Sequence, residues 1–118
     1  MDKKEYLKSA EKCDVNYKRI KELEKIYGNN IDGVLAHLVS FADSVDFFDE
    51  ERRALTYKEI KNASKDLDVN LKELGLIPIV DAYDNTYVVY STKDKCWAKF
   101  NSIDKTLFKQ KKDIADVL

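Results

Sequence analysis

The sequence of 118 residues contains one histidine, one proline, three glycines and two cysteines. Zinc sites need clustered cysteine or histidine ligands, and no such cluster is present. The three scattered glycines form no phosphate-binding loop. Cys13 and Cys96 are too few for a disulfide framework, so we expect reduced thiols. These shortages predict a protein without a metal ion or a cofactor.

Long apolar runs are also missing. No run approaches the ~18 residues that a membrane-spanning helix needs. The first residues, Met1–Glu5, lack the apolar stretch of a secretory signal. We therefore expect a cytoplasmic protein. With 44% hydrophobic and 36% charged residues, the chain suits a single globular domain over residues 1–118 that buries its own core.

The charges nearly cancel, with 21 Lys and Arg against 22 Asp and Glu, but they are unevenly distributed. Residues 28–51 contain six acids and neither Lys nor Arg, whereas residues 93–112 contain seven lysines and two acids. Solvated surface is the simplest explanation of either run. The functional interpretation is a polarised surface that selects a charged partner.

Apolar residues at helical spacing predict three helices in the first third of the chain. The first runs through Tyr6–Cys13, the second covers 17–27 and ends at Gly28, and the third runs through Ile31–Val39. The third helix has a wide apolar stripe, so we expect Val34 to be buried with the rest of it.

The remainder indicates strands with one inserted helix. Thr56 and Glu59 form a capping box that begins a helix over 57–66, and residues 112–118 suit a short closing helix. Strands are expected at 44–48, 53–55, 76–80, 86–90 and 96–100. Pro78 lacks an amide donor and is expected at an edge, a strand start or a bulge. The order predicts an α+β fold, with N-terminal helices packed on a mostly antiparallel sheet.

Signals for catalysis are poor. His37 is the only histidine, and a pair with Cys13 or Cys96 stays open because such partners meet only in the fold. No local motif supports that pair. The acids near residues 43–51 lack the pattern of a calcium-binding loop. We therefore expect a protein that is not an enzyme.

Nucleic-acid binding is a further hypothesis for the basic stretch 93–112. Trp97, Phe100 and Phe108 lie in it and are residue types that stack on bases. Trp97 and Phe100, however, belong to a predicted strand, which favours a place in the core. The acid-rich stretch would also repel phosphates, so nucleic acid is the less favoured partner.

Three motifs resemble the SMI1/KNR4 family, the core of the SUKH superfamily. Ile20–Gly28 resembles the opening helix of that domain, which ends in Leu-Glu-x-x-Tyr-Gly. Leu76–Asp81 and Asp84–Tyr90 are similar to its Ile-Pro hairpin, and Lys95–Asn101 resembles the strand that follows. The resemblance covers about residues 17–118.

Two departures accompany these motifs. Asn30–Val34 stands where the family usually has Leu-Pro and an acid, and Asn85 replaces the usual glycine of the hairpin loop. Asn also adopts the left-handed conformation, so the hairpin is expected to form.

The resemblance implies partner binding without catalysis. Bacterial members are mostly immunity proteins, which bind and neutralise the toxins of polymorphic systems, and many of those toxins are nucleases. The expected function is neutralisation of a cognate toxin, and the alternative is a regulatory or scaffold module without a toxin partner. Because acids can mimic phosphate in a cationic cleft, the partner-binding residues are expected to be Asp43, Asp46, Asp49, Glu50, Glu51, Asp81 and Asp84.

Overall fold

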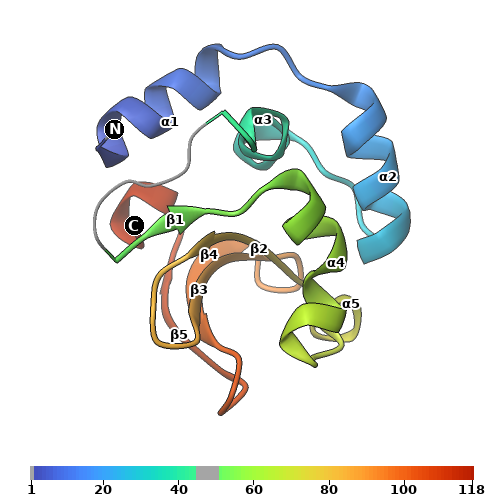
Figure 1. Cartoon of the computed structure of the whole chain (residues 1–118), viewed down its shortest axis with the longest axis vertical. Helices are drawn as coiled ribbons and strands as arrows, with labels where there is room; N and C mark the ends of the chain where they lie inside the picture. The colour runs from blue at the N-terminus through green and yellow to red at the C-terminus, as the bar shows by residue number, and fades with distance from the viewer. Residues whose placement is uncertain (1, 45–50) are drawn as a thin grey trace.

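A computed structural model describes residues 2–44 and 51–118 of the chain. The described part is α+β, as the sequence predicts, and its helices precede and flank one antiparallel sheet (Figure 1). The helices are α1 (Lys3–Lys12), α2 (Tyr17–Tyr27), α3 (Gly33–Phe41), α4 (Tyr57–Leu67), α5 (Leu71–Leu74) and the 3-10 helix η1 (Ile114–Asp116). The strands are β1 (Arg53–Ala54), β2 (Leu76–Asp81), β3 (Thr86–Ser91), β4 (Cys96–Asn101) and β5 (Thr106–Lys111).

The five strands follow one another across the sheet in the order β1-β2-β3-β4-β5. All neighbouring pairs are antiparallel, with Arg53 opposite Asp81 and Thr86 opposite Asn101. The register of β2 against β3 shifts between Pro78 and Val80, so the proline lies at a bulge, one of its three expected positions. Strand β3 lies in the middle of the sheet, and its Val88 and Val89 are fully buried.

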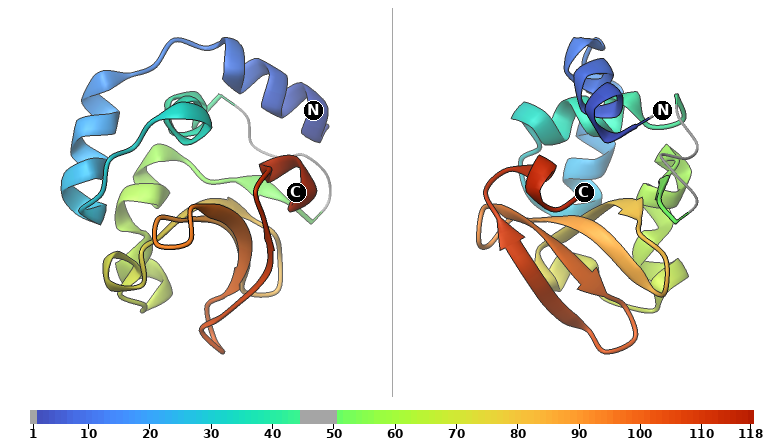
Figure 2. Two further views of the ribbon diagram at one scale, coloured as in Figure 1. Left: turned by 180° about the vertical axis from the view of Figure 1, so that it is seen from behind. Right: turned by 90° about the vertical axis from the view of Figure 1, so that its left-hand side faces the viewer.

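The first three helices stand over the sheet, while α4 and α5 lie along β2 (Figures 1 and 2). Helix α3 packs on both α1 and α2, and α1 also contacts η1. The Lys3 ammonium donates to the carbonyls of Ala115 (2.9 Å) and Leu118 (3.3 Å), so the two ends of the chain lie together. Among residues 2–44 and 51–118, no helix has the length and apolar content to cross a bilayer.

Local signals set the helix ends as expected. Asn16 caps α2 by accepting from the Arg19 amide, and Gly28 ends it in the left-handed conformation. At α4 both halves of the predicted capping box are present, because Thr56 and Glu59 accept from each other's backbone amides. These bonds satisfy amides that the first helical turn leaves unpaired.

Several expectations about individual positions are wrong. Val34 was expected to be buried, yet it is 55% exposed, and Tyr17, in the predicted second helix, is 72% exposed. Leu74 is also exposed, whereas Leu71 beside it is fully buried. Strand β5 has no counterpart in the predicted strands, and the strand expected at 44–48 falls almost entirely outside the described residues. Core burial therefore follows packing between elements more closely than periodicity within one helix.

Candidate partner-binding surface

The turn between β2 and β3 has an uncommon backbone. Tyr83, Asp84 and Asn85 all have positive φ angles, of 73°, 54° and 60°. Asp and Asn reach this left-handed region at little cost, but a bulky residue such as Tyr rarely does. Three such residues in succession mean that the surrounding structure holds the turn in this shape.

Hydrogen bonds from both sides hold the turn. The Tyr83 amide donates to Oδ1 of Asp81 (3.0 Å), and the Thr86 amide donates to the Tyr83 carbonyl (3.1 Å). From the next turn, the Ser102 amide donates to the Asn85 carbonyl over 2.8 Å. The β2–β3 and β4–β5 turns therefore lie together at one end of the sheet.

This end of the sheet exposes large apolar side chains next to acids. Tyr83 is 66% exposed in the first turn and Ile103 is 69% exposed in the second. The Asp84 carboxylate is exposed and bonds to no other side chain or amide in the described parts of the chain. Exposed aromatic and apolar side chains with a polar rim are typical of protein interfaces. We call Asp81, Tyr83, Asp84 and Ile103 the turn surface.

The structure brings some of the predicted acids together. Asp81 and Asp84 share the turn surface, and Asp81 also lies 3.8 Å from the Arg53 guanidinium. Because Arg53 is opposite Asp81, Glu51 is at the same end of the sheet, and its side chain is exposed. Asp46, Asp49 and Glu50 lie outside the described residues.

Asp43 lies elsewhere and has internal partners. Its carboxylate accepts from Arg19 (2.9 Å) and from the Tyr57 amide (3.2 Å), so it links α2 to the start of α4. The guanidinium of Arg19 stacks over the Tyr57 ring at 4.5 Å and completes the link. Asp43 therefore has a structural role at its position.

Two members of the turn surface, Tyr83 and Ile103, were not predicted from the sequence. Tyr83 stands between Ala82 and Asp84 in a predicted turn, with acids at positions 81 and 84. That context is a usable signal, because tyrosine is common at interface hot spots and uncommon in turns that only reverse the chain. Ile103 lies in a similar context between Ser102 and Asp104.

The structure does bring Cys13 and His37 together. His37 Nδ1 lies 3.1 Å from the Cys13 carbonyl, and Cys13 Sγ lies 3.5 Å from the His37 carbonyl. Each side chain thus bonds to the other's backbone and not to the other side chain. Burial, with a smaller effect of Asp14, raises the pKa of the Cys13 thiol, whereas an activated nucleophile needs a lowered one. The pair ties the end of α1 to α3.

The described residues bear on metal binding and on base stacking. Within residues 2–44 and 51–118, no three His, Cys, Asp or Glu side chains gather as metal ligands would. Of the aromatic residues in the basic stretch, Trp97 and Phe100 are buried in the core and only Phe108 is exposed. Trp97 and Phe100 are therefore not available to stack on bases.

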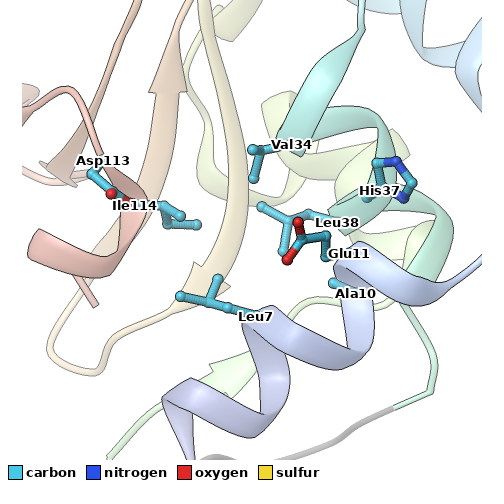
Figure 3. A pocket seen from close by; sticks show the side chains of 8 residues that line it. All are labelled: Leu7, Ala10, Glu11, Val34, His37, Leu38, Asp113 and Ile114. Carbon is cyan, nitrogen blue, oxygen red and sulfur yellow. The ribbon is translucent and has the colours of Figure 1, made fainter.

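A hollow of about 350 Å³ lies between α1, α3 and η1 (Figure 3). The side chains of Leu7, Val34, Leu38 and Ile114 surround it, and the carboxylate of Glu11 lies beside Leu38. Its apolar lining suits an apolar group from a ligand or a partner.

Comparison of the chain with protein-family models, with curated proteins and with solved structures finds no match.

Proposed function

We propose that this chain is a SUKH-type immunity protein that binds a cognate protein toxin and occludes its active site. The observation that carries the proposal is the turn surface, where an exposed Tyr83 lies in the same turn as Asp81 and Asp84, and its amide donates to Asp81. A nuclease toxin has a cationic cleft for its substrate, and carboxylates can take the place of phosphates there. Opposite charges on the two partners would also speed their association.

The fixed backbone of the turn favours binding. A segment that already has its bound shape loses little conformational entropy when a partner docks. The bond from the Tyr83 amide to Asp81 and the bond from Ser102 to Asn85 provide that preorganisation. Tyrosine contributes a large contact area with few rotatable bonds, so Tyr83 is the expected hot spot.

The arrangement of elements also supports the proposal. The resemblance to the SUKH superfamily leads one to expect a helix ending in Tyr-Gly, a capped middle helix and a hairpin beginning with Ile-Pro. Helices α2 and α4 and strands β2 and β3 have this order. Asn85, which stands in place of the hairpin glycine, has the left-handed conformation that the glycine would supply.

The experiment is coexpression of the chain with toxin domains encoded next to its gene. Rescue of growth and binding of the purified toxin are expected, with Tyr83→Ala weakening binding by at least about tenfold. Tyr17→Ala is the matched control, because Tyr17 is equally exposed but lies on α2. If both variants lose toxin binding equally, the turn surface is not the site that binds the toxin.

Charge reversal tests the electrostatic part. Asp84→Lys should slow association and reduce its dependence on salt, whereas Asp14→Lys, an exposed change between α1 and α2, should not. Combined reversal of Asp46, Asp49 and Glu50 tests the acid-rich stretch in the same assay. Unchanged binding after every reversal contradicts phosphate mimicry. If no toxin gene lies beside this gene and coexpression does not rescue growth, the alternative of a regulatory or scaffold module is favoured.

A further inference from the structure

The exposure of Val34 is unusual for its position. It belongs to an apolar helix whose Leu35, Leu38 and Val39 are all buried. Gly33 precedes it with a φ of +56°, and a Cβ at Gly33 would meet open space. The first turn of α3 is therefore uncovered by the described chain and presents an apolar side chain to solvent.

Val34 lies where two hollows adjoin. It lines the apolar hollow of about 350 Å³ and a second hollow of about 240 Å³. On the opposite wall, Lys112 lines the second hollow, while Asp113 and Ile114 line the first. Because Val34 lines both hollows and Lys112 and Asp113 are consecutive, the two hollows adjoin, and we call them together the Val34 groove.

The two ends of the Val34 groove differ in charge. At the first hollow the charged side chains are the carboxylates of Glu11 and Asp113, and Asp113 also caps η1 by accepting from the Ala115 amide. The second hollow is lined by Lys95 and Lys112, together with one acid, Asp32 at the start of α3. Its floor includes Tyr90 and Trp97, whose rings meet edge to face at 5.0 Å between centroids.

We infer that the Val34 groove is a second docking site, which takes an extended segment of a protein partner. The segment carries an apolar side chain for the first hollow, a basic residue for Glu11 and Asp113, and an acidic residue for Lys95 and Lys112. Charge complementarity between the segment and the groove supports this choice of partner. The opposite charges at the two ends also fix the direction of the segment. The inference concerns a surface remote in sequence from Tyr83 and does not require the partner to be a toxin.

The experiment selects random twelve-residue peptides, displayed on phage, against the folded full chain. Enriched peptides should share an apolar residue with Lys or Arg on one side and Asp or Glu on the other. A synthetic peptide of that sequence, labelled for fluorescence polarisation, then measures affinity. Enriched peptides without this pattern, or no enrichment, would overturn the inference.

Two sets of variants locate the binding. Val34→Asp should weaken binding of the peptide by at least about tenfold, while Tyr17→Asp, which places the same charge on an exposed side chain at the start of another helix, should not. Val34→Asp should still fold, because a negative charge is favourable at the N-terminus of a helix such as α3. Val34→Ala is a second variant, which removes apolar surface without adding a charge. Lys95→Glu should weaken binding of the peptide that carries the acidic residue. It should restore binding of a peptide in which Lys replaces that acidic residue. Equal affinity of all variants, or no compensation, contradicts docking in the Val34 groove.

Discussion

The carboxylate of Glu59 meets both arms of the Arg53 guanidinium, with Nη1 2.6 Å from Oε1 and Nη2 2.8 Å from Oε2. Oε1 also accepts from the Thr56 amide at 2.9 Å. One side chain therefore closes the capping box of α4 and ties that helix to β1. The bond with Arg53 is the main reason why the pKa of Glu59 is lowered to about 2.

The low pKa of Glu59 predicts a defined acid dependence of stability. The folded pKa lies below the value of about 4.3 for an unfolded Glu, so the stabilisation is complete above that value. It is lost as the pH falls from about 4.5 through 2. Glu59→Gln should lower the free energy of unfolding at pH 7 by about 1 kcal/mol and flatten its dependence over this window.

Urea unfolding at pH 7, 4 and 2.5 measures this effect. Asp104→Asn, a change in an exposed acid of the β4–β5 turn, is the control and should keep the pH dependence of the unchanged protein. If Glu59→Gln has the same slope as the control, the bond with Arg53 does not stabilise the folded state.

Two glycines with nearly equal φ angles should differ in their response to alanine. Gly28 and Gly75 end helices with φ of +74° and +72°, so both substitutions carry the left-handed penalty of about 1–2 kcal/mol. A Cβ at Gly28 meets the flexible end of Lys72 at 2.9 Å. A Cβ at Gly75 meets Thr92 Oγ1 at 2.7 Å, and that hydroxyl is held by donation to the Gly75 carbonyl.

Gly75→Ala should therefore destabilise the protein by about 1 kcal/mol more than Gly28→Ala, because it displaces a bonded side chain. Urea unfolding of the two variants under identical conditions gives the comparison. Equal losses would mean that the Thr92 contact relaxes without cost.

The buried hydroxyl of Tyr27 predicts a cost for its removal. It donates to the Ile60 carbonyl over 2.6 Å and joins α2 to α4. Tyr27→Phe should lower the free energy of unfolding by about 1–2 kcal/mol, whereas Tyr17→Phe, at an exposed position, should change it by less than about 0.5 kcal/mol. Chemical denaturation measures both, and an unaffected Tyr27→Phe would show that this bond adds nothing to stability.

Asp43 should act on stability and not on partner affinity. Asp43→Asn keeps an oxygen for the Tyr57 amide and tolerates the φ of 77°, so a loss of under about 0.5 kcal/mol is expected. Asp43→Ala loses both bonds and should cost about 1–2 kcal/mol. Thermal unfolding and toxin binding are measured in parallel. If a fully folded Asp43→Asn protein binds the toxin more weakly, Asp43 belongs to the partner-binding surface.

Local chemistry made many features predictable. The capping box of Thr56 and Glu59 and the stop at Gly28 depend only on neighbours in the chain. The strand of residues 86–90 is rich in β-branched and aromatic side chains and forms β3 as expected. Strand β5 lacked such a signal because most of its side chains are exposed. It forms a strand because it pairs with β4.

Charge alone drew attention to Asp81 and Asp84, whereas Tyr83 beside them offers only the weaker signal of an aromatic residue in a predicted turn. Its exposure depends on a backbone that Asp81 and the neighbouring Ser102 hold in place. Asp43 shows the reverse case, since its charge suggested an interface and its contacts with Arg19 and Tyr57 give it a structural role.

By itself, the sequence determined the α+β class, most helix boundaries and the central strands, because caps, glycines and β-branched runs act over a few residues. The tertiary structure alone decided that Val34 faces solvent, that β5 forms and that two turns meet beside Tyr83. Those outcomes depend on which elements pack together, and packing brings together residues far apart in the chain. Periodicity shows that a helix has an apolar face, but only its neighbours determine how much of that face they cover.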